Sequence, residues 1–459
     1  MKRRKFLAGV ASVASAVSVV PRHVLGGPGY VAPSENVHVA IAGAGGRGRK
    51  VLRGMLQEPN VRAVAVADPA QEFSLQDFYY RDVGGRVPTQ ELIDTHYAKN
   101  GSASKCAGYE NFEEMLSEEN DIDAVVCAAP DHLHAYISTK CLEAGKHVYC
   151  EKPLTHNIGE ARRVAKLAAE SGLATQMGNQ GHSTDGIRTT CEWIWGGAIG
   201  RVKEVHAWVS GHRWNPQLEG LPAETQSPPA GLNWDLWQGP RNAPNFSTAY
   251  FPVAWRDFWA FGNSNIGDFG CHDLDAACWA LDLASPTSIE FHPTQPCNAD
   301  IGPHGCIGYY DFPANDRHDG LRVTWYDGGL KPPRIPTWPA ARPLPGRGIL
   351  FIGTEGELFC PGAGGDPELL GDRPVPDVPA SLPRVKNHAN DWLKAIAGER
   401  PAGSNFVYGA RLTELALLGA LSLRTGKRIQ WHAADMKAIG LPEADAIIHE
   451  ACRSGWEIS

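Results

Sequence analysis

The sequence predicts an α/β protein with two domains: an N-terminal doubly wound parallel sheet, and a C-terminal α+β domain whose open sheet is mostly antiparallel. Between residues 37 and 177, short apolar runs alternate with segments of helical periodicity, which is typical of parallel strands joined by helices. After about residue 178, alternating strands occur with few helices between them, which favours antiparallel pairing. We therefore expect the domains to span 35–178 and 179–459.

Strands and helices are expected to alternate along the first domain. The expected strands are 37–42, 61–67, 124–128, 147–150 and 174–177, and the expected helices are 47–57, 112–117, 133–144 and 158–171. The polar stretch 71–104 interrupts this order, and we interpret it as an insertion after the second strand.

The second domain has a different pattern. Strands are expected at 203–210, 321–326 and 349–352, and two proline-rich segments, 330–345 and 367–383, are expected to be surface loops. An apolar helical stripe covers 406–424, and we expect these last helices to pack back on the first domain.

Residues 1–27 have the pattern of an export signal. The twin arginines Arg3 and Arg4 precede a weakly apolar stretch, 8–20, which is too short to span a membrane as a helix. Because this pattern resembles a Tat signal, we expect export to the periplasm by the Tat machinery, or a cytoplasmic protein if the leader is not functional. No integral membrane domain is expected.

Composition argues against two kinds of partner. The formal net charge is -8, and no basic stripe lies outside the leader, so a nucleic acid is not an expected partner. The eleven cysteines include no CxxC pair, and several fall in expected core elements. This distribution indicates reduced, buried thiols, and we expect no metal site.

A glycine-rich turn follows the first expected strand. The segment 43–48 fits G-x-G-x-x-G, in which the first glycine allows a tight turn, the second lets the backbone approach a pyrophosphate, and the third lets the helix pack close to the strand. The sequence therefore predicts a dinucleotide site here. The residues expected to contact the cofactor at the turn are Gly43, Gly45, Gly46, Arg47 and Gly48.

Asp68 ends the second apolar run, twenty residues after Gly48. An acid at this place accepts hydrogen bonds from the ribose diol and repels a 2′-phosphate. We therefore expect NAD as the cofactor in preference to NADP. Since free NAD is not expected outside the cytoplasm, an exported protein would have to hold its cofactor tightly.

Two polar segments follow buried strands, APDHLH at 129–134 and EKP at 151–153. The carboxyl ends of parallel strands are where open α/β sheets bind ligands. Together with the glycine turn and Asp68, these segments resemble the Gfo/Idh/MocA oxidoreductases, in particular their exported, twin-arginine branch. The resemblance covers about residues 37–459 and implies an enzyme that transfers hydride between a nicotinamide cofactor and its substrate.

A second signature of that family is an Asp and a His four residues apart, and here it reads Asp268 and His272. This spacing places both side chains on one face of a helix. The resemblance implies that Lys152 and His272 are the acid/base pair of the reaction. Asp268 would orient the substrate hydroxyls.

Other cofactor contacts are expected around these residues. The resemblance implies that Glu151 and His134 contact the nicotinamide ribose or its surroundings, with Pro130 and Lys152 as further cofactor contacts beside them. At the crossover between the domains, Asn179 or Gln180 could reach the nicotinamide amide or the substrate.

Trp255 and Arg256 lie in a segment dense in aromatic residues. Flat apolar rings and a fork of hydrogen-bond donors suit carbohydrate, so both are expected substrate contacts, as are Lys152, Asp268 and His272.

The sequence thus favours an NAD(P)-dependent oxidoreductase acting on a ring hydroxyl or ketone of a sugar, glycoside or polyol, in either direction. One alternative is a glycosidase of the same family that works by transient oxidation and elimination. Another is a non-catalytic sensor that binds NAD and sugar. By family analogy, an exposed sheet face in the second domain makes a homo-oligomer the expected state.

Overall fold

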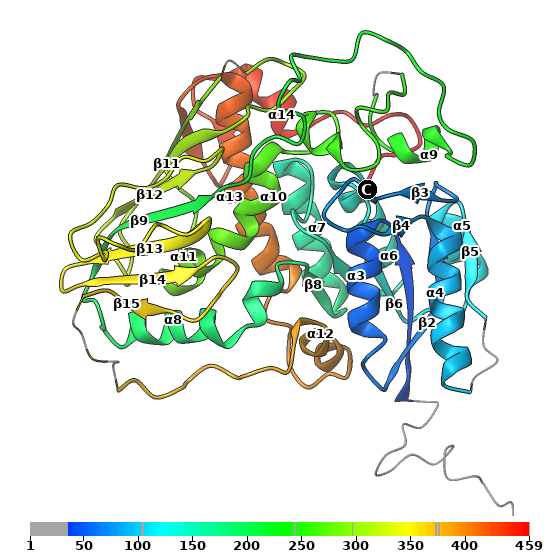
Figure 1. The fold of residues 1–459 in the computed structure, drawn as a ribbon, viewed down its shortest axis with the longest axis horizontal. Coiled ribbons are helices and arrows are strands. Elements are labelled where there is room, and N and C mark those ends of the chain that lie inside the picture. The colour runs from blue at the N-terminus through cyan, green and yellow to red at the C-terminus, as the bar shows by residue number, and fades with distance from the viewer. Residues whose placement is uncertain are drawn as a thin grey trace, which may run out of the picture.

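The computed structural model describes residues 35–101, 105–242, 245–295, 297–371, 374 and 377–458. A six-stranded sheet and a nine-stranded sheet lie side by side, with a layer of helices between them (Figure 1). The predicted fold class is confirmed. The predicted leader, 1–27, lies outside the described residues.

The first sheet is entirely parallel. Its strands are β1 Val37–Ala42, β2 Val61–Ala67, β5 Ala107–Tyr109, β6 Ala124–Cys127, β7 His147–Cys150 and β8 Thr175–Met177. They run in the order β5-β2-β1-β6-β7-β8. Strand β6 is buried along its whole length, because helices cover both faces of the sheet. The chain continues to opposite sides of β1, so ligands are expected at the carboxyl ends of β1 and β6.

Five helices accompany these strands. They are α3 Gly46–Met55, α4 Arg86–Lys99, α5 Phe112–Glu118, α6 Asp131–Glu143 and α7 Ile158–Ser171. The stretch predicted as an insertion holds a short hairpin, β3 Phe73–Ser74 and β4 Val83–Gly84, and then α4. The sequence did not predict α4, since its buried side chains, Thr89, Ile93 and Tyr97, form too sparse an apolar stripe.

The second sheet is mostly antiparallel, as predicted. Its strands are β9 Val202–Val209, β10 Ser288–Pro293, β11 Cys306–Phe312, β12 Leu321–Tyr326, β13 Arg347–Gly353, β14 Glu357–Pro361, β15 Glu368–Leu369, β16 Ile429–His432 and β17 Lys437–Ala438. The order is β15-β14-β13-β9-β12-β11-β10-β16-β17, and β9 with β12 is a parallel pair.

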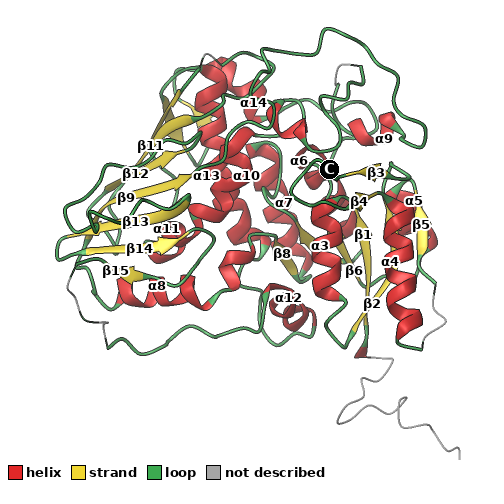
Figure 2. Ribbon diagram, in the orientation of Figure 1, coloured by secondary structure: helices red, strands yellow, loops and turns green. Residues whose placement is uncertain are grey.

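The helices of the second half lie between the two sheets and around their edges (Figure 2). They are α8 Asp185–Trp195, α9 Trp234–Gln238, α10 Ser264–Asp273, α11 Asp275–Ala280, α12 His388–Ile396, α13 Phe406–Thr425 and α14 Asp445–Ile448. Short 3-10 turns occur at Gln180–Ser183, Ala254–Asp257 and Pro442–Ala444. Helix α13 is long and apolar enough to cross a membrane, but 83% of that stretch is buried. It packs against α7, α10 and β8, which identifies it as a core helix joining the two halves.

A proline-rich segment covers part of the outer face of the second sheet. On this face Trp208, Leu350 and Phe359 pack against Trp338, which belongs to the segment 330–345. The indole nitrogen of Trp338 donates a hydrogen bond to the carbonyl oxygen of Arg342, which holds the segment in its fold. The face on which we based the expected homo-oligomer is therefore partly occupied by the chain itself, and self-association stays a prediction.

Candidate active site

The glycine-rich turn lies between the end of β1 and the start of α3. Gly43 has a φ of +95°, and a Cβ atom on it would lie 2.4 Å from the main-chain nitrogen of Ala129. A Cβ atom on Gly48 would lie 2.1 Å from the carbonyl oxygen of Gly43. Close backbone contacts therefore require both glycines, as the motif predicts.

Helix α3 begins at this turn with no side-chain cap. Gly45 occupies the N-cap position, and the first turn contains no acidic residue. The first N–H groups of a helix and the positive end of its dipole favour an anion. The turn therefore fits the pyrophosphate of a dinucleotide.

Asp68 is buried at the carboxyl end of β2. Its Oδ2 accepts a 2.6 Å hydrogen bond from the main-chain N–H of Ala44, and its Oδ1 accepts a 2.8 Å bond from that of Ala70. Burial raises the pKa of Asp68 to about 6, although the two hydrogen bonds by themselves would lower this pKa. The two bonds orient the carboxylate, and each oxygen keeps a lone pair for a ribose hydroxyl.

A cleft connects the glycine turn with α10. Most of the residues singled out from the sequence line this cleft, from Gly43 at one end to Asp268 at the other. Those that line it are Gly43, Gly45, Gly46, Arg47, Asp68, Pro130, His134, Glu151, Lys152, Trp255, Arg256 and Asp268. Those that do not are Gly48, Asn179, Gln180 and His272.

Three charged side chains meet at the α10 end of the cleft. The Nζ of Lys152 lies 2.5 Å from Oδ1 of Asp268 and 2.7 Å from the carbonyl oxygen of the same residue. The Nε of Arg256 lies 3.3 Å from the same Oδ1, and its guanidinium stacks 4.1 Å from the ring centre of Trp255. Burial alone would raise the pKa of Asp268, but Lys152 and Arg256 hold it well below its usual range. The end of the cleft therefore contains an ammonium and a guanidinium held by one carboxylate.

His272 lies one turn after Asp268 on α10 and is half-buried. Burial, and then the charge of Lys152, lower the pKa of His272 well below its usual value, so its imidazole is neutral. Its Nδ1 is buried and has no hydrogen-bond partner among the described residues. Such an orphaned ring nitrogen is able to accept or donate a proton once a ligand hydroxyl reaches it.

Glu151 lies at the carboxyl end of β7 and is buried. Its Oε1 accepts hydrogen bonds from the amide of Gln180 at 2.8 Å and from the hydroxyl of Tyr149 at 3.4 Å. Its Oε2 lies 4.0 Å from the Nε of Arg47 and has no hydrogen-bond partner among the described residues. Glu151 therefore offers the cleft a free carboxylate oxygen, and Gln180 acts on the cleft through Glu151.

Asn179 is turned away from the cleft. Its amide donates to Oδ2 of Asp275 at 2.8 Å, and its Oδ1 accepts a bond from the hydroxyl of Ser404 at 2.5 Å. The expected contact with the nicotinamide amide therefore has no support in this geometry, because the polar atoms of Asn179 are used to join α11 to the segment before α13.

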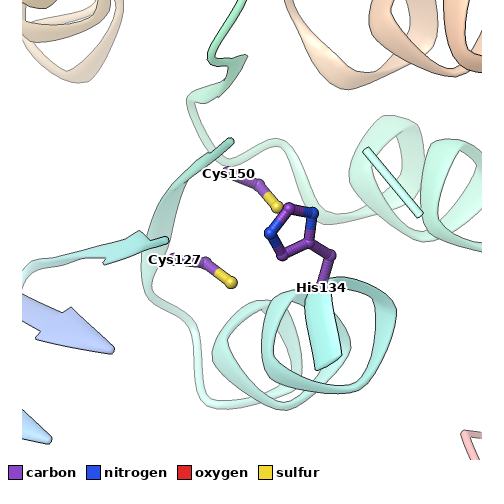
Figure 3. A group of neighbouring side chains, drawn as sticks. All are labelled: Cys127, His134 and Cys150. Atoms are coloured by element: carbon purple, nitrogen blue, oxygen red, sulfur yellow. The ribbon is translucent and has the colours of Figure 1, made fainter. Parts of the chain in front are cut away.

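His134 lines the floor of the cleft, next to two thiols. Figure 3 shows its ring beside the sulfur atoms of Cys127 and Cys150, and the ligand atoms of the three residues lie within 4.8 Å of one another. However, the Nδ1 lies 2.7 Å from the carbonyl oxygen of Pro153, and the Nε2 lies 2.8 Å from that of Ala129. Neither ring nitrogen is free for a metal ion in this arrangement. The expectation of no metal stays a prediction.

Asp131, which we did not single out from the sequence, also lines the cleft. It is buried in the first turn of α6, and burial raises its pKa to about 7, with Arg256 and Lys152 opposing this shift. The cleft therefore holds, besides Asp68, a second carboxyl group whose pKa burial raises towards neutrality. An acid at the first turn of a helix is common, so the sequence alone carried no signal for this role.

The sequence also did not predict the aromatic cover of the cleft. Phe73 and Tyr80 reach over it from the β3–β4 hairpin, Phe251 from the second half of the chain, and Trp456 from the C-terminal segment. An ideal Cβ on Gly46 would lie 2.4 Å from the ring of Tyr80, so this ring packs directly on the glycine turn. Three segments distant in sequence therefore contribute aromatic rings to the cleft.

Comparisons with known proteins agree with this geometry. Residues 37–179 match the model of the oxidoreductase family with an NAD-binding Rossmann fold, Gfo/Idh/MocA, and residues 195–312 match the model of that family's C-terminal alpha/beta domain. Solved structures of similar fold include the WlbA dehydrogenase of Bordetella pertussis in complex with NADH and UDP-GlcNAcA. The match has a TM-score of 0.59 and 16% identity, and covers 86% of this chain and 99% of that one.

Curated relatives match over shorter stretches. Levoglucosan dehydrogenase of Pseudarthrobacter phenanthrenivorans is 31% identical over 224 residues, which are 47% of this chain and 50% of that protein. Inositol 2-dehydrogenase of Rubrobacter xylanophilus is 32% identical over 142 residues, which are 30% of this chain and 33% of that protein. The matched part thus spans half or less of the length of these relatives.

Proposed function

This chain belongs to the Gfo/Idh/MocA oxidoreductase family, and from that premise we propose that it transfers hydride between NAD and a ring hydroxyl or ketone of a sugar, glycoside or polyol. The observation that carries this proposal is the ion pair of Lys152 and Asp268, joined by Arg256, at the end of a cleft that begins at a dinucleotide turn.

The residues present fit the cofactor. The uncapped start of α3 suits the pyrophosphate, the carboxylate of Asp68 suits the ribose diol, and Oε2 of Glu151 is a free acceptor nearer the reactive end. Bound NAD supplies the hydride acceptor, and its reduced form the donor. The negative charge of Asp68 disfavours the 2′-phosphate of NADP.

Proton transfer is assigned to the side chains around Asp268. When a substrate hydroxyl is oxidised, its carbon loses a hydride and its oxygen loses a proton. The ammonium of Lys152, which lines the cleft, donates a hydrogen bond to the oxygen as it becomes a carbonyl. We assign the base to His272, one helical turn after Asp268 and outside the residues that line the cleft, whose neutral imidazole takes the proton once the bound hydroxyl reaches its unpartnered Nδ1. Asp268 positions Lys152 and Arg256. In the reverse direction, the same groups return the proton.

A carbohydrate or polyol substrate is supported by two further facts. Trp255 and Arg256 present a stacked ring and guanidinium to the cleft. In addition, two relatives carry the names levoglucosan dehydrogenase and inositol 2-dehydrogenase. We infer a substrate with several hydroxyl groups, in which Asp268 and Arg256 orient the hydroxyl next to the reacting carbon.

We also propose export through the Tat route. The support is the twin-arginine pattern of Arg3 and Arg4, which precedes the mildly apolar stretch 8–20. The Tat machinery transports folded proteins, so the cofactor would be bound before export. A fusion of residues 1–34 to a reporter protein tests this step, since replacing both arginines by lysine should keep the reporter in the cytoplasm.

The activity is tested on purified protein with a panel of sugars and polyols. Reduced nicotinamide absorbance that grows on addition of a sugar supports oxidation. Release of an aglycone without net reduction of NAD would instead identify a glycosidase that works by transient oxidation. Binding of NAD and sugar with neither reaction would identify a sensor.

A further inference from the structure

The β3–β4 hairpin carries an aromatic tip, of which Tyr79 and Tyr80 line the cleft. Two consecutive turns form the tip, with hydrogen bonds from the N–H of Phe78 to the oxygen of Leu75 and from the N–H of Arg81 to the oxygen of Phe78. Arg81 has a φ of +45°, an unusual conformation for a residue with a side chain. Strained backbone of this kind persists only where surrounding contacts hold it in place.

Several contacts hold the hairpin. Asp82 forms ion pairs with Arg49 at 3.1 Å and with Arg53 at 2.8 Å, both on α3. At its base, the N–H of Gln71 donates a 2.7 Å hydrogen bond to the oxygen of Gly231, in the second half of the chain. The aromatic tip is therefore fixed to both halves of the molecule, so binding a ligand to it costs little ordering entropy.

The tip forms a row of rings with Trp214, which belongs to the second half of the chain. The ring centres of Tyr79 and Tyr80 lie 4.0 Å apart, and Tyr79 is nearly parallel to Trp214, with an interplanar angle of 20° and ring centres 6.0 Å apart. Yet 61% of Tyr79 is exposed, the largest exposure of any large hydrophobic residue among those described. A large ring held in solvent marks an interaction site more often than a packing residue does.

Tyr79 lines the same cleft as Arg256 and Asp268. The carboxylate of Asp257 accepts hydrogen bonds from the N–H groups of Trp214, at 2.9 Å, and Asn215, at 2.8 Å. Because Asp257 directly follows Arg256, one short segment positions both the expected substrate contact and the outer ring.

We propose that Tyr79 and Trp214 form an outer subsite for a second sugar ring, so that the substrate is a glycoside of at least two rings and not a free monosaccharide or polyol. This inference rests on the proposed function. The ring to be oxidised lies beside Lys152 and Asp268, and the neighbouring ring lies on Tyr79. The C–H face of a pyranose is apolar, and burying it on an aromatic ring is favourable, whereas its hydroxyls stay in water.

The test compares sugars in pairs. Each sugar of the panel is assayed as the free sugar and as the reducing or non-reducing unit of a disaccharide. The value of kcat/KM is measured for the free sugar and for the disaccharide. We expect the disaccharide of the preferred sugar to exceed the free sugar by about threefold to tenfold, the range that one aromatic stacking contact provides.

Two variants assign this preference to the row of rings. Tyr79→Ala should raise KM for the disaccharide to that of the free sugar and leave the free sugar unchanged. Tyr79→Phe is the matched control, since it keeps the ring and should keep the preference. NAD affinity is measured for both variants, because Tyr80 covers the glycine turn, and it should not change.

The outcomes separate the two proposals. If free sugars are oxidised as well as their disaccharides, or if Tyr79→Ala lowers kcat/KM equally for both, the outer subsite is wrong and the proposed function stands. If no sugar in the panel reacts in either form, the proposed function fails, and the subsite fails with it.

Discussion

The two ends of the cleft are built in different ways. The dinucleotide end consists of main-chain atoms from one continuous turn, in which Gly43 and Gly48 leave no room for a Cβ atom. The α10 end consists of charged side chains from two distant parts of the chain: Lys152, and the pair Arg256 and Asp268, which lie more than 100 residues later. The first should therefore be sensitive to added volume, and the second to a lost charge. Substitutions at each end test this difference.

The largest effect is expected from Lys152→Met. This change keeps the length of the side chain but removes the hydrogen bond to the reacting oxygen. Among the described residues, Arg256 is then the remaining ion-pair partner of Asp268. We expect turnover to fall by about a thousandfold or more, within the range of acid/base groups, with NAD affinity nearly unchanged. Steady-state kinetics and NAD titration by fluorescence measure the two quantities. Normal turnover would refute the role assigned to Lys152.

Gly48→Ala tests the other end by adding a single methyl group. The new Cβ would lie 2.1 Å from the oxygen of Gly43, so the turn must move and NAD affinity should fall by about a hundredfold. Gly54→Ala is the control on the same helix, because no atom lies within 4 Å of its Cβ position. That variant should bind NAD normally and be more stable by about 0.5–1 kcal/mol. Equal NAD affinities in the two variants would contradict the close contact.

A smaller effect is expected for Asp68→Ala. A hydrogen bond to a charged group contributes about 1.5–3 kcal/mol, so loss of the contacts with the ribose should weaken NAD binding by roughly tenfold to a hundredfold. The preference for NAD over NADP should shrink at the same time, because the repelling charge is gone. Titration of both cofactors measures this, and an unchanged ratio would show that Asp68 does not face the ribose.

The smallest effect concerns the proton balance of the charged end. Burial raises the pKa of Asp131 to about 7 in the folded protein. Its carboxyl group therefore contributes fully to stability when the pH is below the pKa of an ordinary Asp, and this contribution is lost as the pH rises through about 7. As the pH rises through about 7, we expect the Tm of Asp131→Asn to fall by about 2 °C less than the Tm of the unchanged protein. The inflection of kcat/KM near pH 7 should disappear in this variant.

Asp327→Asn is the control for that measurement. Burial also raises the pKa of Asp327, to about 6, but this residue lies beside Cys306 and Trp325 in the second sheet. It should change the pH dependence of stability and leave the activity profile as it was. If the inflection of kcat/KM near pH 7 is still present in Asp131→Asn, a group other than Asp131 causes it.

The sequence predicted the parts of the site that are local. Gly43, Gly48 and Asp68 follow from a strand, a turn and a second strand, and their roles depend on steric rules that hold wherever the motif occurs. The spacing of Asp268 and His272 likewise placed both on one helix, where the structure has them. Asn179 shows the limit of this reasoning. Its amide is hydrogen-bonded to Asp275 and Ser404, which lie 96 and 225 positions away, and no local pattern predicts that these segments meet.

The sequence alone determined which residue types are present and where the chain turns, because glycine conformation, strand alternation and helix spacing act over a few residues. Which charges meet and which rings cover the cleft depends on how the distant segments pack together. The pairing of Lys152 with Asp268 spans 116 positions, and the stacking of Tyr79 with Trp214 crosses from one half to the other. Such contacts depend on how two sheets pack, and packing is set by the summed burial of many side chains rather than by any local pattern.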